Sequence, residues 1–245
     1  MALIFSQPTG PIFIILDKGY PFVLTIIIAD AELETIPAEM RDDYSIRKIA
    51  GERKKKVDAI ILDSNYMHSA IDRYFPGESN RRGRPDIIHI FLLVAMDSIL
   101  NRTGNLRVRI HTRNDLVIDI SPDTRLPRAY NRFIGLFEKL FAEGKIAADG
   151  KTLLQIQKGT LNSAIESHDE RVLAMAPDAP IKPIDSLISG SGDMTVIIGG
   201  FSEGNYRSNI DKFEKASIFN EELTIWSVGM EVITQYERVL RENPQ

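Results

Sequence analysis

The sequence predicts an α/β protein built on a parallel β-sheet flanked by helices. Segments 22–29 and 194–198 are continuously apolar and rich in β-branched residues, as strands buried on both faces of a parallel sheet are. Segments with helical periodicity lie between these strands, and several begin at a proline or a serine, which favour the start of a helix. This alternation of buried strands and helices is typical of a parallel sheet covered on both faces.

The N-terminal third contains the first of these strands and several shorter elements. Residues 1–20 form an extension of unknown role, whose short apolar run is either an added strand or a poorly anchored segment. After the strand over 22–29 we predict a helix over 31–41, a basic stretch over 53–56, a central strand over 59–62 and a helix over 64–74 capped by Ser64. The basic stretch is interpreted as a solvated loop or helix end.

The middle of the chain is expected to place basic residues at a helix N-terminus. Pro85 occupies the first position of a helix predicted over 85–100, and Asp86 lies near the positive end of its dipole. The preceding loop, 81–84, holds three arginines where unpaired backbone N–H groups also attract anions. Apolar and basic residues then alternate over 106–111, which predicts a strand with one basic face, and a turn leads to a further strand over 116–120.

The C-terminal half is predicted to contain two strands and two long helices. The first helix opens near Pro127 and has the apolar stripe Tyr130, Phe133, Ile134, Phe137, Leu140 and Phe141. The remaining predictions are a short helix after Gly159, strands over 172–175 and 194–198, and a long helix from about Leu223.

Arginine carries all the positive charge of the segment 81–132. This segment contains ten arginines, five aspartates and no lysine, whereas the whole chain has a net charge of −4. The planar guanidinium group binds phosphate through two hydrogen bonds and stacks on bases, which the ammonium group of lysine does not do. We therefore interpret the segment as a local nucleic-acid contact, with a solvated charged surface as the alternative. Arg128 and Arg132 are expected side by side on the flank of one helix, with Arg125 close by.

Glycines directly follow the predicted strand over 194–198. Gly199 and Gly200 would allow a ligand to approach the backbone, although a plain strand-to-loop turn is the alternative. Glu203, Glu221 and Glu222 near this loop would repel a nucleotide phosphate but tolerate a cationic cofactor without phosphate. S-adenosylmethionine has these properties.

Composition excludes several other classes of site. The chain has no cysteine and only four scattered histidines, so we expect no disulfide, no thiolate nucleophile and no metal. The longest apolar run is too short to span a bilayer and the start lacks a basic signal region, so we expect a cytoplasmic protein without a membrane partner.

Several motifs, in the same order, resemble those of one known family. They are 62–66 (Leu-Asp-Ser-Asn-Tyr), 82–89 (Arg-Gly-Arg-Pro-Asp-Ile-Ile-His), 124–128 (Thr-Arg-Leu-Pro-Arg), 132–133, 197–201 and 217–220 (Ser-Ile-Phe-Asn). Together they resemble the small-subunit ribosomal RNA pseudouridine N1-methyltransferases, an archaeal and eukaryotic branch of the SPOUT methyltransferases. The resemblance covers 21–245 and is loose over 176–191.

The resemblance implies a fold, a cofactor and a partner. It implies a single SPOUT domain over 21–245, with a parallel sheet, RNA-binding elements at about 81–132 and a deep trefoil knot at about 172–245 that binds S-adenosylmethionine. Family members are homodimers with RNA bound across the interface. The cofactor-binding residues carried over from the family are Gly199, Gly200, Gly204, Ile218, Phe219, Asn220, Glu221, Glu222 and Leu223.

The implied reaction is methylation of N1 of a pseudouridine in a hairpin of small-subunit rRNA, during ribosome biogenesis. The implied RNA-binding residues are Arg84, Arg125, Arg128 and Arg132. Arg84 and Asp86 are the candidate catalytic residues: Arg84 would stabilise the developing anion, and Asp86 would either orient Arg84 or accept the proton. We favour orientation, because an ion-paired carboxylate is a weak base. The alternatives are an RNA-binding ribosome-assembly factor whose methylation is secondary or absent, and a SPOUT enzyme that acts on tRNA.

Overall fold

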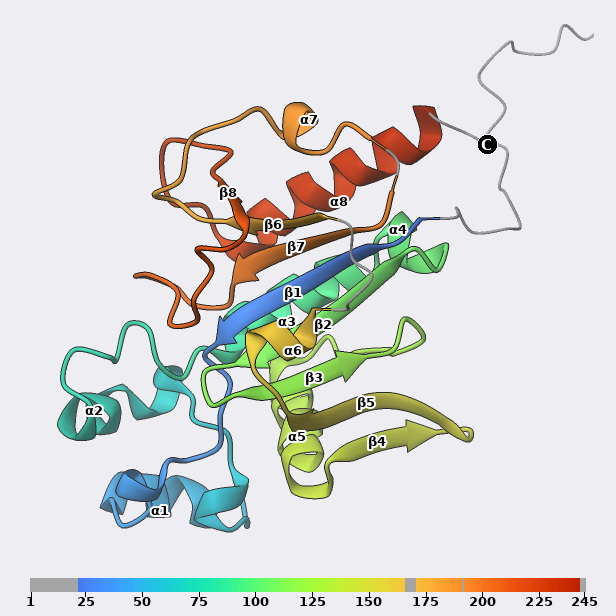
Figure 1. The fold of residues 1–245 in the computed structure, drawn as a ribbon. Coiled ribbons are helices and arrows are strands. Elements are labelled where there is room, and N and C mark those ends of the chain that lie inside the picture. Colours follow the sequence, from blue (N-terminus) through green and yellow to red (C-terminus); the bar gives the residue numbers. More distant parts are fainter. Residues whose placement is uncertain (1–21, 166–170, 191, 243–245) are drawn as a thin grey trace, which may run out of the picture.

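The computed structural model describes residues 22–165, 171–190 and 192–242, and eight strands in these ranges form one mixed sheet (Figure 1). The strand order is β4-β5-β3-β2-β1-β7-β6-β8. The strands are β1 (Leu24–Ala31), β2 (Leu106–Thr112), β3 (Leu116–Ile120), β4 (Lys145–Ala148), β5 (Lys151–Lys158), β6 (Arg171–Met175), β7 (Met194–Gly199) and β8 (Glu214–Ala216). Five neighbouring strands, β2, β1, β7, β6 and β8, are parallel. At the other edge, β3, β5 and β4 extend the sheet in antiparallel pairing.

The central strand β1 confirms the prediction from its continuous apolar sequence. All eight of its residues are buried. It pairs in parallel with β2 on one side and β7 on the other, so that Ile26 lies between Val108 and Val196. A strand enclosed by neighbours at both edges and by side chains on both faces has no polar alternation.

Helices cover both faces of the sheet. On one face α3 (Pro85–Met96), α4 (Ile99–Arg102), α5 (Tyr130–Glu143) and α8 (Ile225–Glu242) pack over a large apolar core. On the other face α6 (Leu161–Ala164) covers β1 and β2, and Figure 1 shows it on the opposite side from α3, α5 and α8. Gly229 permits close packing of α8 on α3, because a Cβ there would lie 2.5 Å from the Phe91 ring.

Most helix predictions are confirmed, with shifted ends. Pro85 does begin α3, which ends at Met96 and not near residue 100. The helix expected from Pro127 begins at Tyr130, and the predicted stripe residues Phe133, Ile134, Phe137 and Leu140 are buried. The long C-terminal helix begins at Ile225, two residues after the predicted start.

Two predictions in the segment after β1 are wrong. Residues 31–41 form no α-helix: Ala31 ends β1, Thr35 makes an isolated bridge with Ile61, and Pro37 leads into a single 3-10 turn, Ala38–Met40. The following helix is α1 (Tyr44–Glu52), since the Asp43 side chain caps it by accepting the N–H groups of Ser45 and Ile46.

The segment 59–62 is not a central strand. Val57–Ala59 form a 3-10 turn, and Ile60 and Leu62 are buried in a small separate core with α1 and α2 (Ser64–Tyr74). The cap of α2 is Asp63, whose carboxylate accepts the Asn65 N–H, and not Ser64. The extension 1–20 lies outside the described residues.

Candidate functional site

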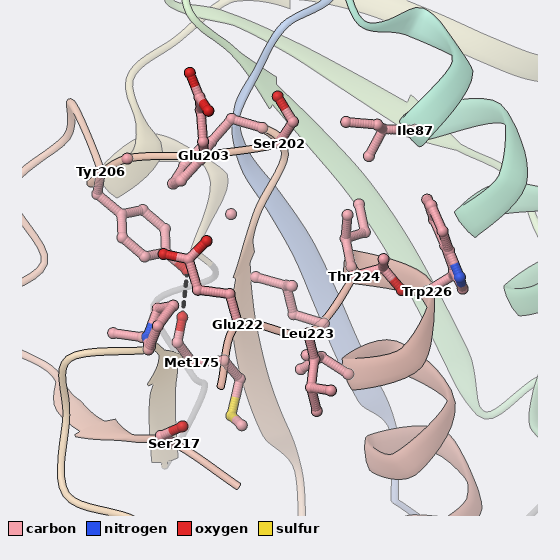
Figure 2. A pocket seen from close by; sticks show the side chains of 18 of the residues that line it. Ile87, Met175, Ser202, Glu203, Tyr206, Ser217, Glu222, Leu223, Thr224 and Trp226 are labelled. Atoms are coloured by element: carbon pink, nitrogen blue, oxygen red, sulfur yellow. Dashed lines mark hydrogen bonds between the residues drawn. The ribbon is translucent and has the colours of Figure 1, made fainter. Parts of the chain in front are cut away.

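A cavity of about 280 Å³ lies at the carboxyl ends of β6 and β7. Its floor comes from Met175, Ile198 and Gly199, and its walls come from the loops that follow β6, β7 and β8 and from the start of α8. Ligands bind at this edge of parallel sheets because the loops there are free to form a crevice. Figure 2 shows Tyr206 and Glu222 on one side of the cavity and Ile87 and Trp226 on the other.

Six of the nine predicted cofactor residues line this cavity: Gly199, Gly204, Ile218, Glu221, Glu222 and Leu223. The other three, Gly200, Phe219 and Asn220, are not among its lining residues. Gly200 has a packing role, because its N–H donates to Ala29 O and a Cβ would lie 2.7 Å from the backbone of Ala31.

The sequence reasoning missed several lining residues, including Met175, Phe201, Tyr206, Thr224 and Trp226. Tyr206 is the clearest case: its hydroxyl donates to Met175 O at 2.7 Å and joins the loops after β6 and β7 (Figure 2). Burial raises the pKa of Tyr206 well above its usual value, so the hydroxyl remains a donor. No motif signals this residue, since its partner is a backbone carbonyl of a distant strand.

The loop after β7 is anchored by a buried carboxylate at the end of β1. Asp30 accepts the N–H groups of Arg207 and Ser208 at 2.7 and 2.9 Å, and the Ser208 hydroxyl at 2.6 Å. Its backbone has φ of 52°, a conformation that residues other than glycine rarely adopt. The loop that closes the cavity is therefore fixed to the sheet and not held only by its own turns.

The two predicted catalytic residues form an ion pair at the cavity rim. Arg84 lines the cavity, and its Nε and one terminal nitrogen each donate to a different oxygen of Asp86 at 2.9 Å. The hydrogen bond to Asp86 raises the pKa of Arg84 above its ordinary value. The backbone of Arg84 is also fixed, because its N–H donates to Glu32 O. This two-point geometry orients the guanidinium group more firmly than a single contact would.

The three remaining predicted RNA-binding arginines are exposed at the start of α5. Within the described chain, no hydrogen bond or ion pair involves the side chains of Arg125, Arg128 and Arg132. Arg128 and Arg132 do not lie together on a helix flank as predicted, because α5 begins only at Tyr130. The Tyr130 hydroxyl donates to Asp63 at 2.7 Å. Burial is the main cause that raises the pKa of Tyr130, and this hydrogen bond is the second.

The arginine-rich segment does not form one uniform basic surface. Arg81, Arg82 and Arg113 belong to a largely buried ion network with Glu32, Glu34 and Glu78. Arg82 and Arg113 have side chains less than one tenth exposed, so they are not available to a polyanion. Composition alone could not separate these structural arginines from the exposed ones, because their carboxylate partners lie outside the segment.

The cavity suits S-adenosylmethionine by its lining residues and by its charge. A Cβ at Gly199 would lie 2.6 Å from the Phe201 ring, so glycine at this position lets that ring pack against the floor of the cavity. Ile198, Leu223 and Val228 give apolar walls, and Glu221 and Glu222 stand at the cavity with their negative charge. This combination suits a ligand with an apolar body and cationic groups, and disfavours one with phosphates.

The described ranges contain neither a metal cluster nor a membrane-spanning helix. There, no cluster of three or more histidine, aspartate or glutamate side chains is arranged to hold a metal ion. No helix in the same ranges combines the length and apolar character needed to cross a bilayer.

Several known proteins are similar to this chain in sequence and in fold. The model of the EMG1/NEP1 methyltransferase family matches residues 26–237. A "Ribosomal RNA small subunit methyltransferase Nep1" of Thermoplasma volcanium is 54% identical over 220 residues, covering 89% of this chain and 99% of that protein. The protein of the same name from Pyrococcus furiosus is 46% identical over 218 residues, covering 87% and 96%.

A solved structure of a protein with the same name, Nep1, is also similar to this chain. The crystal structure of Archaeoglobus fulgidus Nep1 bound to S-adenosylhomocysteine matches with a TM-score of 0.78 and 33% identity, covering 91% of this chain and 99% of that one. The match extends over nearly the full length of each relative, and the family model spans the sheet, the cavity and α8. This chain therefore belongs to the EMG1/NEP1 methyltransferase family.

Proposed function

We propose that this protein methylates N1 of a pseudouridine in small-subunit ribosomal RNA, during ribosome biogenesis, with S-adenosylmethionine as methyl donor. One observation carries the proposal: Arg84, held by Asp86, reaches the same cavity that Gly199, Glu221 and Glu222 line. The curated relatives are named as rRNA small subunit methyltransferases, and the solved relative binds the demethylated cofactor.

The reaction needs an electrophilic methyl group, a correctly positioned nucleobase and an acceptor for one proton. S-adenosylmethionine supplies an electrophilic methyl group. N1 of pseudouridine would form a bond to that carbon as the bond between carbon and sulfur breaks. S-adenosylhomocysteine would leave, and N1 would lose its hydrogen as a proton. Arg84 stabilises the negative charge that develops on the base as the proton leaves. Asp86 holds Arg84 in place through two hydrogen bonds, and solvent takes the proton.

RNA would reach the cavity along the start of α5. Arg125, Arg128 and Arg132 are exposed, and Tyr130 between them joins the same cluster as Arg84 through Asp63 and Asp86. Ribosomal RNA targets are read mostly in single-stranded loops, so the target base would be turned out of a hairpin loop into the cavity. Arg128→Ala and Arg132→Ala should therefore weaken RNA binding and leave cofactor affinity unchanged.

We also propose a homodimer, a C-terminal trefoil knot and a single domain over 21–245, in a cytoplasmic protein. The knot is supported by the path after β8: Ser217 bonds to Pro180 and Lys182 in the loop after β6, and the chain then returns to pack α8 on α3 and β1. The segment after β8 thus runs beside the loop after β6, as the proposed threading requires. Such threading is a rare exception among protein folds.

Calorimetry and a methyl-transfer assay test the proposed function. Stoichiometric binding of S-adenosylmethionine, and label transfer to a pseudouridine hairpin but not to the same hairpin with uridine, are the expected results. Gly199→Val should abolish both, because its side chain would enter the space of the Phe201 ring. Tight RNA binding without cofactor binding would instead favour an assembly factor.

A further inference from the structure

The lobe formed by α1 and α2 lies outside the proposed site but has an unusual surface. Figure 1 shows the two helices beyond the end of β1, and their apolar residues form a core of their own. The basic stretch 53–56 closes α1, and Lys54, Lys55 and Lys56 are exposed there. This stretch is the one charged motif of the N-terminal third that the proposed reaction leaves without a role.

An exposed aromatic side chain lies beside these cations. The Tyr66 side chain, in the first turn of α2, is 57% exposed, and the guanidinium group of Arg53 is 5.6 Å from its ring centroid. Solvent-facing aromatic rings next to cations are what single-stranded nucleic acids bind, because bases stack on the rings and phosphates pair with the cations. Tyr66 differs from an isolated exposed tyrosine such as Tyr44, because a cation lies against its ring.

The backbone of the basic stretch keeps a lysine in an unfavourable conformation. Lys54 follows the last turn of α1 with φ of 53°, and its N–H donates to Gly51 O at 3.0 Å. Glycine is the usual residue at this left-handed position after a helix. The helix dipole favours cations near a helix C-terminus, but neighbouring Arg53, Lys55 and Lys56 already provide them. The dipole therefore does not account for a lysine at the strained position.

The lobe surface is joined to the surface of the predicted RNA-binding arginines. Glu138 on α5 is buried, accepts the N–H of Ile61 at 3.2 Å and pairs with both Arg53 and Lys55. Asp63, three residues before Tyr66, accepts a hydrogen bond from the hydroxyl of Tyr130, which also lies on α5. Two separate links thus hold the basic stretch and Tyr66 against α5, the helix that carries Arg132.

We propose that Arg53, Lys54, Lys56 and Tyr66 form a second RNA-binding surface, which binds a single-stranded segment flanking the hairpin that carries the target nucleotide. A base stacks on Tyr66, and adjacent phosphates pair with Lys54 and Lys56. The inference rests on the proposed function, since it requires an RNA substrate. This second surface is remote from the cavity, and the reaction on a hairpin without flanking segments does not require it.

Two RNAs and one aromatic substitution test the stacking contact. Binding is measured for the pseudouridine hairpin alone and for the same hairpin with a single-stranded extension of about ten nucleotides on either side. Tyr66→Ala should weaken binding of one extended RNA by roughly five- to hundredfold and leave the bare hairpin unaffected. Tyr44→Ala is the matched control, because Tyr44 is 82% exposed at the opposite end of α1.

Lys54→Gly tests the charge without endangering the fold. Glycine relieves the left-handed backbone, so the melting temperature should rise. Affinity for the extended RNA should nevertheless fall, and the slope of its logarithm against log salt should decrease by about 0.7. Lys158→Ala, an exposed lysine at the end of β5, should change neither quantity.

The second RNA-binding surface and the proposed function are tested by different results. If wild-type protein binds both RNAs equally, or if Tyr66→Ala and Lys54→Gly bind the extended RNA as wild type does, the second RNA-binding surface does not exist. If wild-type protein transfers no methyl group to the bare hairpin, the proposed function fails instead.

Discussion

At the residue scale, the two proposed catalytic residues, Arg84 and Asp86, form an ion pair at the rim of the cavity. Both residues were predicted from one contiguous motif, and the structure brings them together at two distances of 2.9 Å. Since both Asp86 oxygens accept hydrogen bonds from Arg84, the carboxylate is occupied in holding the guanidinium group. Orientation of Arg84 is therefore favoured over proton abstraction as the role of Asp86.

Asp86→Asn separates these two roles by their pH dependence. If Asp86 orients Arg84, the variant keeps weak activity that rises with pH, because hydroxide or water can take the proton while a loosened Arg84 still stabilises the anion. Single-turnover methyl transfer to a hairpin, measured between about pH 6 and 9, is the test. A variant that binds cofactor and RNA normally but is inactive at every pH would make Asp86 the base.

The predictable part of the cavity is the part encoded in short motifs. Gly199 was found because it directly follows a predicted strand, and Glu221 and Glu222 were found because the family motif covers them and their charge suits a cationic ligand. Tyr206 and Trp226 were not found, since they reach the cavity only through the packing of distant loops. Gly200 was assigned to the cofactor, yet its position is set by contact with Ala31.

At the scale of elements, Arg81 joins the loop that carries Arg84 to the loop that closes the cavity. Its Nε donates to buried Glu32 at 2.9 Å and one terminal nitrogen donates to Asn205 O at 2.8 Å. Its guanidinium group also stacks 4.1 Å from the centroid of the Phe201 ring, which lines the cavity. These contacts make Arg81 a positioning residue and not an RNA-binding one.

Arg81→Met should lower cofactor affinity by about tenfold, because losing hydrogen bonds worth roughly 1.4 kcal/mol frees the loop that carries Phe201. Methionine retains the apolar contact with that ring. The dissociation constant of S-adenosylmethionine, measured well below the melting temperature, is the readout. Arg102→Ala, which removes an exposed pair with Asp97, serves as control. A lower melting temperature with unchanged cofactor affinity would reduce Arg81 to a purely structural role.

Glu214 holds the edge strand β8 through ion pairs with Arg171 and Lys182, and these pairs require its carboxylate to be ionised. Hydrogen bonds from Arg171 and Lys182 lower the pKa of Glu214 below its usual value, although burial opposes this. A carboxyl group with a lower pKa in the folded state stabilises the fold above its unfolded pKa of about 4.5, and this stabilisation is lost as pH falls. Glu214→Gln should therefore destabilise the protein at pH 7, by melting temperature, and much less below about pH 4. An equal loss at both pH values would exclude the ion pairs as the cause.

The element predictions failed where a segment is apolar but lies outside the sheet. Residues 59–62 were predicted as a central strand because they are continuously apolar, yet Ile60 and Leu62 are buried against α1 and α2. Residues 31–41 have helical periodicity, but Glu32 and Glu34 are drawn into the ion network with Arg81, Arg82 and Arg113. Both errors come from partners far away in sequence, which local patterns do not reveal.

At the scale of the whole molecule, the sequence predicted the parallel half of the sheet better than the rest. Strands β1 and β7 are buried on both faces, and such strands have a distinctive composition. The hairpin of β4 and β5 is mostly exposed and has no such signature, so these two strands were not predicted, whereas β3 was. The proposed knot depends on which loop encloses which segment, and amino-acid composition carries no information about that.

The helix layer of α3, α4 and α8 leaves apolar side chains facing solvent, and this surface is where the proposed homodimer should form. Ile90, Ile99 and Met230 are exposed on these three helices, and α8 packs against the other two. A carboxylate placed in an apolar interface loses its hydration without gaining a partner. Ile90→Glu should therefore convert the dimer to a monomer in sedimentation velocity, without changing affinity for S-adenosylmethionine.

RNA affinity should fall in the same variant, because the arginines of two subunits would no longer act together on one hairpin. Ile181→Glu provides the control: Ile181 is also exposed, but it lies in the loop after β6 and away from this helix layer. Its variant should sediment as the wild type does. A wild-type monomer, or an Ile90→Glu protein that remains a dimer, would exclude this surface as the interface. Monomers that kept full RNA affinity would show that each subunit reads its hairpin alone.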